Sequence, residues 1–121
     1  MEIKKIMICD DDQDILDVLD IMLEIEGYTV ITEIDSTNII NKIKDRSPDL
    51  LLLDLWMPVL SGDQVLKIIR GTKEIENLPV IILSASVDGN DIANNAGANA
   101  FIPKPFNMDE VVDVIKKTLL S

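Results

Sequence analysis

Five short apolar runs recur along this chain, and a stretch with helical periodicity follows each of them. The runs are Ile6–Cys9, Tyr28–Ile31, Leu50–Leu53, Val80–Leu83 and Ala100–Ile102. They are continuous rather than alternating, which is typical of parallel strands covered on both faces. The run Tyr28–Ile31 is the most polar of the five, and we expect it towards an edge of the sheet.

The stretches between the runs carry apolar residues at helical spacing. Helices are expected over Asp14–Glu26, over Ser36–Arg46, from Ser61, over Asp88–Ala96 and from Asn107. Asp12 or Asp14 is expected to cap the first helix and Gly27 to end it, and Asp35 is expected to cap the second helix. The sequence that begins at Ser61 has the form of a capping box. The asparagine-rich stretch "NNAGANA" predicts that the fourth helix is short and mobile.

Strand and helix therefore alternate five times, which predicts right-handed crossovers and a sheet with helices on both faces. The predicted fold class is α/β, a doubly wound five-stranded parallel sheet. A chain of 121 residues fits one domain, which we assign to residues 1–121.

The charge balance limits the partners that this domain can bind. Asp and Glu number 22 against 11 Lys and Arg, which gives a net charge of −11. A nucleic-acid backbone would be repelled, so direct nucleic-acid binding is not expected. No apolar run approaches the roughly 20 residues that a membrane span needs, and the N-terminus lacks the features of a signal peptide. We therefore expect a cytoplasmic protein without membrane insertion.

Two residue types restrict the chemistry further. The single cysteine, Cys9, closes an apolar run, so we expect a packed core residue and no internal disulfide. The chain has no histidine, which excludes Ser-His-Asp and Cys-His catalysis and zinc sites that contain histidine. A phosphohistidine cannot form on this chain. Any metal should be a hard cation with oxygen ligands.

Polar residues follow four of the five predicted strands. Asp10 and Asp11 follow the first run, Asp54 the third, Ser84 the fourth and Lys104 the last. Parallel strands end at the same edge of a sheet, and ligands bind there. We therefore expect three carboxylates, a hydroxyl and an ammonium group to meet at this edge. The aspartates need not be buried, because they emerge from the sheet.

Clustered carboxylates disfavour one another's ionised forms. A divalent cation removes that penalty, and a set of oxygen ligands suits Mg²⁺. A carboxylate beside such a cation can attack phosphorus and form an acyl phosphate. The lysine and the hydroxyl would then neutralise and hydrogen-bond the transferred group.

Four motifs in this order carry a family resemblance: "CDDD", "DLWMP" with Gly62 shortly after it, "LSAS" and "FIPKPF". With them, nearly all 121 residues resemble the response-regulator receiver domain of two-component signalling, in the CheY-like superfamily. The resemblance implies a flavodoxin-like (βα)5 fold with strand order 2-1-3-4-5. It also implies a signalling switch rather than an enzyme, limited to self-catalysed phosphotransfer and autodephosphorylation.

The resemblance assigns roles to the residues of the motifs. Asp54 would accept a phosphoryl group from a phosphohistidine of a sensor histidine kinase or a histidine phosphotransfer protein. Asp10, Asp11, Asp54 and the backbone carbonyl of Trp56 would hold Mg²⁺ or Mn²⁺. Lys104 would pair with the phosphoryl group.

The switch residues follow from the same resemblance. Ser84 would move to hydrogen-bond the phosphoryl group, and Phe101 would change rotamer on activation. A cis peptide is expected between Lys104 and Pro105.

The chain departs from the family pattern in three places. Trp56, two residues after the acceptor, is bulky and is predicted to alter autodephosphorylation or partner choice. Phe101 lacks the hydroxyl of the commoner tyrosine, so it could report only by packing. The stretch from Ser84 to Lys104 is about two residues shorter than usual. The loss falls in the fourth helix and puts dimerisation through that face in question.

Each site residue also has a plainer interpretation when it is taken alone. Asp54 could be a turn aspartate before Pro58, Ser84 a loop hydroxyl, Lys104 a solvated charge and Phe101 a core residue. Their order at successive strand ends favours the site.

Three other functions fit the sequence less well. A Mg²⁺-dependent aspartyl-phosphate phosphatase would need an aspartate at the position of Trp56. A flavin carrier would need a Ser/Thr/Gly-rich loop after the first strand and more aromatic residues than the 3% present. A degenerate receiver acting as a scaffold would not need the complete acceptor set. The chain is either a stand-alone regulator or part of a longer one. Met1 just before the first strand and the end after the last helix favour the stand-alone form.

Overall fold

The structure, a computed structural model, describes residues 2–121. Five parallel strands form one sheet in the order β2-β1-β3-β4-β5. The strands are β1 (Lys5–Cys9), β2 (Thr29–Glu33), β3 (Leu50–Asp54), β4 (Val80–Ser84) and β5 (Ala100–Pro103). The predicted α/β class, the strand order and the edge position of the second strand are confirmed.

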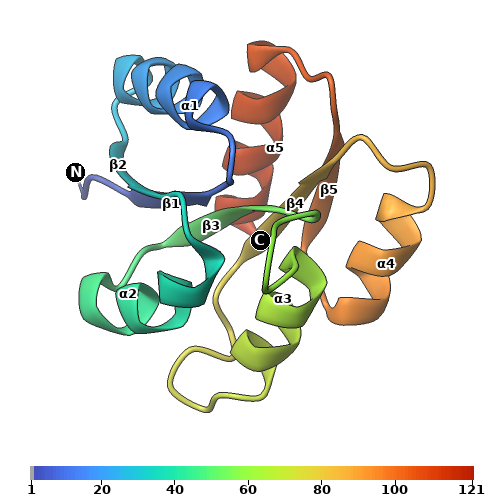
Figure 1. Cartoon of the computed structure of the whole chain (residues 1–121). Helices are drawn as coiled ribbons and strands as arrows, with labels where there is room; N and C mark the ends of the chain where they lie inside the picture. The colour runs from blue at the N-terminus through green and yellow to red at the C-terminus, as the bar shows by residue number, and fades with distance from the viewer. Residues whose placement is uncertain (1) are drawn as a thin grey trace.

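Helices cover both faces of this sheet (Figure 1). They are α1 (Gln13–Ile25), α2 (Ile39–Arg46), α3 (Gly62–Arg70), α4 (Gly89–Ala96) and α5 (Met108–Leu120), with a 3-10 turn, η1 (Ser36–Asn38), before α2. Figure 1 shows α1 and α5 on one side of the sheet and α2 and α3 on the other, with α4 beside β5. Among residues 2–121, no helix combines the length and apolar character needed to cross a membrane.

The boundaries differ from the predictions by a few residues. Strand β2 starts one residue later than expected and runs on to Glu33, because it pairs in parallel with β1 as far as Cys9. The second helix begins as the 3-10 turn η1, which Asp35 caps by accepting a hydrogen bond from the Thr37 amide at 2.9 Å. Helix α4 has eight residues and is short, as predicted.

Side chains provide the expected start and stop signals of the helices. The Asp12 side chain accepts a hydrogen bond from the Asp14 amide at 2.9 Å and caps α1. Gly27 follows the end of that helix with φ of +98°, a conformation that glycine adopts without steric cost. The amide of Ser61 donates to the Gln64 side chain at 3.0 Å at the start of α3. These bonds satisfy backbone groups that a helix end leaves free.

The core consists of two apolar layers, one on each face of the sheet. Alternate residues of β1, β3 and β4 point to opposite layers, so these strands are buried on both faces. One layer joins Ile6, Ile8 and Leu52 to α1 and α5, and the other joins Met7, Leu51 and Leu53 to α2, α3 and α4. Each fully buried aliphatic side chain contributes about 1.5–3 kcal/mol. This double burial explains why the strand sequences are apolar without alternation.

Candidate functional site

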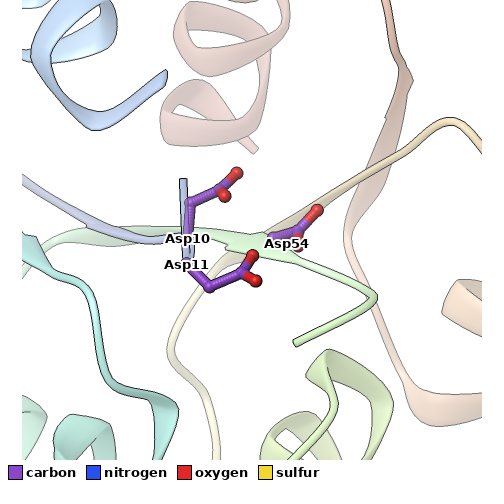
Figure 2. A group of neighbouring side chains, drawn as sticks. All are labelled: Asp10, Asp11 and Asp54. Carbon is purple, nitrogen blue, oxygen red and sulfur yellow. The ribbon is translucent and has the colours of Figure 1, made fainter. Parts of the chain in front are cut away.

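The carboxyl ends of β1 and β3 bring three carboxylates together. Figure 2 shows Asp10 and Asp11, after β1, pointing towards the side chain of Asp54 at the end of β3. One oxygen from each of the three lies within 4.8 Å of the others. The strands are neighbours in the sheet, with Cys9 opposite Leu53. The parallel register therefore places the residues that follow them side by side.

Asp10 is fully buried, which corrects the expectation that these aspartates stay out of the interior. Its two carboxylate oxygens have separate partners. Oδ1 accepts a hydrogen bond from the Asp12 amide at 2.9 Å, and Oδ2 pairs with the Lys104 ammonium at 3.0 Å. A buried carboxylate is stable when it is paired and hydrogen-bonded in this way. Asp11, by contrast, is exposed.

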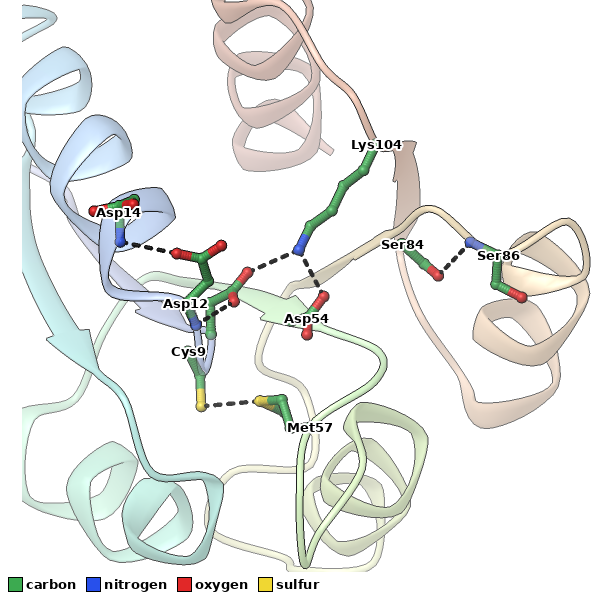
Figure 3. A network of polar contacts seen from close by, with 9 residues as sticks. Cys9, Asp12, Asp14, Asp54, Met57, Ser84, Ser86 and Lys104 are labelled. Atoms are coloured by element: carbon green, nitrogen blue, oxygen red, sulfur yellow. Dashed lines mark hydrogen bonds and ion pairs between the residues drawn. The ribbon is translucent and has the colours of Figure 1, made fainter.

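Lys104 links the two buried carboxylates. Its Nζ lies 3.0 Å from Asp10 Oδ2 and 2.9 Å from Asp54 Oδ1. The side chain comes from the segment after β5, and the Lys104 amide donates to the Ser84 carbonyl at 2.9 Å, which holds this segment against β4. The peptide between Lys104 and Pro105 is cis, as predicted. Figure 3 shows the lysine reaching from β5 across to β3.

The environment of Asp54 makes its ionised form less favourable than it is in water. Burial raises the pKa of Asp54 to about 6, and the charge of Asp10 adds to the rise, while the bond from Lys104 opposes it. For Lys104, burial acts to lower the pKa, but the bonds to Asp54 and Asp10 outweigh it and the pKa is raised. One ammonium group thus leaves the negative charge of three carboxylates only partly neutralised.

These residues fit a hard divalent cation. Three carboxylates each offer one oxygen to a common point, and oxygen ligands of this kind suit Mg²⁺. The Lys104 ammonium pairs with two of these carboxylates, and a cation would supply the further positive charge that three clustered carboxylates need. The predicted roles of Asp10, Asp11 and Asp54 as ligands therefore agree with the donor set. The role of the Trp56 carbonyl stays a prediction.

The loop after Asp54 is held tightly against β3. The Gly62 amide donates to the Leu55 carbonyl at 2.7 Å, and a Cβ at Gly62 would lie 2.2 Å from the Asp54 carbonyl oxygen. Only glycine fits there. Within the loop the Leu60 amide donates to the Pro58 carbonyl at 2.8 Å across Val59, whose φ is +70°. This γ-turn is strained for a β-branched residue.

Two aromatic side chains flank the site differently. Trp56, two residues after the end of β3, keeps 55% of its surface exposed. Phe101 on β5 is half-buried and packs against the layer under α4. A Cβ at Gly89, the first residue of α4, would lie 3.0 Å from the Phe101 ring. The Phe101 ring therefore contacts the first residue of α4.

The Ser84 hydroxyl lies at the end of β4 and is almost fully buried. Its oxygen accepts a hydrogen bond from the Ser86 amide at 3.0 Å. The Ser86 hydroxyl in turn donates to the Asp88 carboxylate. Figure 3 shows the Ser84 hydroxyl directed to Ser86 and away from Asp54. The roles of Ser86 and Asp88 were not predicted, and the Ser-x-Ser spacing in "LSAS" is the signal that suggests such a turn.

Cys9 lies below the cluster as a core residue, as predicted. Its Sγ is 3.7 Å from the Met57 sulfur (Figure 3). Burial, with the charges of Glu33 and Asp10, raises the pKa of the thiol to about 12. A thiol of this kind stays protonated and unreactive.

Comparisons with known proteins show which family this chain resembles. A family model described as a response regulator receiver domain matches residues 6–116. The response regulator GtcR of Aneurinibacillus migulanus is 41% identical over 118 residues, which cover 96% of this chain and 48% of GtcR. The transcriptional regulatory protein KdpE of Mycobacterium tuberculosis (strain ATCC 25618 / H37Rv) is 39% identical over 107 residues, 87% of this chain and 46% of KdpE.

A solved structure extends the likeness to three dimensions. The receiver domain of NtrX from Brucella abortus superposes with a TM-score of 0.88 at 32% identity, covering 96% of this chain and 98% of that chain. This chain spans about half the length of the two relatives named above. The fold, the acidic cluster with its lysine and the match over residues 6–116 lead to one assignment: this chain belongs to the family of response regulator receiver domains of two-component systems.

Proposed function

We propose that Asp54 accepts a phosphoryl group from a phosphohistidine of a sensor histidine kinase or a histidine phosphotransfer protein. The observation that carries this proposal is the meeting of Asp10, Asp11, Asp54 and Lys104 at one sheet edge. Family membership supports a kinase partner. Self-catalysed transfer and hydrolysis are then the only chemistry of this chain.

In the proposed transfer a carboxylate oxygen of Asp54 forms a bond to phosphorus. The bond from phosphorus to the imidazole nitrogen breaks, and its electron pair stays on the imidazole. Asp54 must be ionised to attack, and its pKa of about 6 leaves it mostly ionised at pH 7. Mg²⁺ held by Asp10, Asp11 and Asp54 would supply positive charge for these carboxylates and for the phosphoryl oxygens.

Two further side chains would act on the transferred group. Lys104 already lies 2.9 Å from Asp54 Oδ1, so its ammonium can neutralise charge that develops on a phosphoryl group there. Ser84 would donate its hydroxyl proton to a phosphoryl oxygen. Because that hydroxyl is directed to the Ser86 amide, it must turn to do so. This reorientation of the Ser84 hydroxyl would be the conformational switch.

The position of Trp56 favours a switch over a phosphatase. An acid or base two residues after the nucleophile would speed hydrolysis of an acyl phosphate, and Trp56 offers neither. KdpE is a transcriptional regulatory protein about twice as long. The downstream effect of this chain would accordingly pass through another segment or through a partner protein. The net charge of −11 argues against nucleic-acid binding by the receiver itself. A cytoplasmic location stays a prediction.

The first test is phosphorylation by a small donor. The protein is incubated with acetyl phosphate and Mg²⁺ and weighed by intact mass spectrometry, beside Asp54→Ala and the control Asp45→Ala on the exposed face of α2. One added phosphoryl group is expected in the wild type and the control, and none in Asp54→Ala or without Mg²⁺. If acetyl phosphate fails, a phosphorylated histidine kinase is tried. Failure with both donors, or labelling of Asp54→Ala, would refute the assignment.

A further inference from the structure

Two loops at the carboxyl edge of the sheet line a small notch, which we call the Val59 notch. Its walls are residues 34–36 after β2 and residues 57–59 after β3: Ile34, Asp35, Ser36, Met57, Pro58 and Val59. The Ser36 hydroxyl donates to the Pro58 carbonyl at 3.4 Å and joins the two walls. Strand β2 forms one edge of the sheet and β5 the other, so the notch is separate from β5 and α4.

The size of the Val59 notch fits one side chain of a partner. Its volume is about 220 Å³, below the roughly 300–1,000 Å³ of sites for small-molecule ligands. The walls are mostly apolar, and part of their surface faces water. Ile34 is 47% exposed and Val59 88% exposed, while Met57 is nearly buried. An apolar side chain placed between Ile34 and Val59 would remove this surface from water.

The backbone of Val59 is strained, and the side chain does little to offset the strain within this chain. Its φ of +70° is unfavourable for a β-branched residue, whereas glycine would adopt it freely. Because most of its side chain is exposed, Val59 gains little from packing. Strained residues of this kind gather at functional sites. A partner that covers the side chain would offset the strain.

A carboxylate at the notch is available to a cation. The Thr37 hydroxyl and amide both donate to Asp35 Oδ1, at 2.7 and 2.9 Å, and these bonds hold the pKa of Asp35 below its ordinary value. Among residues 2–121, the hydrogen bonds to this carboxylate all go to Oδ1, which leaves Oδ2 free. Lys42 on α2 is already engaged by Glu33 at 3.1 Å and by the Thr32 carbonyl at 2.9 Å. The net charge of −11 also favours a cationic partner.

We propose that the Val59 notch docks a basic segment of a partner protein, which inserts one apolar side chain between Ile34 and Val59 and sets an arginine or lysine against Asp35 Oδ2. The apolar walls accept the side chain, and the carboxylate selects the cationic flank. Because the bond from Ser36 to Pro58 already joins the two loops, docking requires little ordering of the chain. Docking needs no phosphoryl group on Asp54 and therefore goes beyond the proposed function.

Short peptides test the notch directly. The probe is acetyl-Arg-Leu-Arg-amide, titrated into ¹⁵N-labelled protein while amide chemical shifts are recorded. Saturable changes centred on residues 34–37 and 57–60 are expected. Acetyl-Arg-Gly-Arg-amide should bind at least about tenfold more weakly, because it lacks the apolar side chain. Acetyl-Glu-Leu-Glu-amide should not bind. No saturable change at these two loops, or equal binding of the leucine and glycine peptides, would overturn the proposal.

Val59→Gly separates docking from stability. The variant should be more stable than the wild type, because glycine relieves the strain, and yet bind the peptide at least about threefold more weakly. Loss of folding therefore cannot explain weaker binding. Ile34→Ala should weaken binding by a similar factor. Ile68→Ala, 42% exposed on α3 and outside the notch, is the matched control and should bind as the wild type does. Equal binding by wild type and Val59→Gly would refute the notch.

Asp35→Asn isolates the charge. Asparagine also caps helix starts, so the η1 turn is kept, and binding should weaken about two- to fivefold, as for an exposed ion pair. Asp45→Asn, exposed on α2, is the matched control. Equal weakening by both variants would mean that the peptide follows net charge alone, which contradicts the proposal.

A second copy of this chain is the other possible occupant, although two chains that each carry −11 repel one another. Sedimentation velocity of the free protein distinguishes the two occupants. A monomer at all concentrations is expected. Dimers that form with rising concentration and disappear in Val59→Gly would assign the notch to a second copy and overturn the proposal.

Discussion

The buried carboxylate of Asp54 should make the stability of the metal-free protein depend on pH. Asp54 has a pKa of about 6 in the folded protein against an ordinary value of 3.8, chiefly because it is buried. The folded state therefore holds this proton more tightly than the unfolded state does. Well below pH 4 the carboxyl is neutral in both states. As the pH rises from about 4 to beyond 6, the unfolded state gives up the proton first and stability is lost.

The size of this loss follows from the change in pKa. At about 1.36 kcal/mol for each pH unit, it amounts to at most about 3 kcal/mol. Asp54→Asn keeps the shape of the side chain and cannot ionise. In EDTA we therefore expect the variant to gain up to about 3 kcal/mol over the wild type by pH 7.5, and little at pH 4. Lys104 stays protonated throughout this range, so it does not add to the difference.

Urea unfolding followed by circular dichroism measures the effect from pH 4 to pH 8. Other carboxylates titrate in both proteins, so only the difference between wild type and Asp54→Asn is informative. Asp45→Asn, exposed on α2, is the matched control and should follow the wild type. Mg²⁺ should stabilise the wild type more than Asp54→Asn. Parallel curves for wild type and Asp54→Asn would show that Asp54 ionises without penalty, and the electrostatic reasoning would be wrong.

Four further predictions concern the surroundings of the site. Val59→Gly should stabilise the protein by about 1 kcal/mol, because relief of a left-handed conformation exceeds the entropy cost of glycine; a lower midpoint of thermal unfolding would contradict this. Gly62→Ala should destabilise by about 2–3 kcal/mol, since its Cβ would lie 2.2 Å from the Asp54 carbonyl oxygen; a wild-type urea midpoint would refute the steric argument. Cys9 should react with a disulfide reagent only when the protein unfolds, since it is buried with a pKa of about 12; fast labelling of native protein would show otherwise. Trp56→Asn should change the lifetime of phosphorylated protein or its partner preference, and no change in either would dismiss that role.

Local patterns were enough to predict the architecture. The apolar runs coincide with the five strands to within two residues, because strands buried on both faces cannot alternate. The cap of α1, at Asp12 or Asp14, and the cap at Asp35 were predicted from short-range chemistry, since a side chain and the amide two residues later are neighbours whatever the fold. The 3-10 turn before α2 was not predicted, because tertiary packing of this segment decides between a 3-10 turn and an α-helical turn.

The site was predicted less completely than the fold. The order of strand ends brought Asp10, Asp11, Asp54, Ser84 and Lys104 to one edge, and the structure agrees. The burial of Asp10 was not expected, because it depends on a lysine 94 residues away in the sequence.

The hydrogen bonds that Arg70 donates to the Gly97 carbonyl and the Asn99 side chain, and the bond from the Ser86 amide to the Ser84 hydroxyl, were not predicted from the sequence. Polar side chains have many possible partners, and only the packed chain selects among them. The sequence by itself determined which residues reach the carboxyl edge of the sheet, because hydrophobic periodicity defines the strands and parallel strands end together. Only the tertiary structure decided which of those residues are buried, which oxygen each donor reaches and how α4 is held, because these depend on distances between segments far apart in the chain.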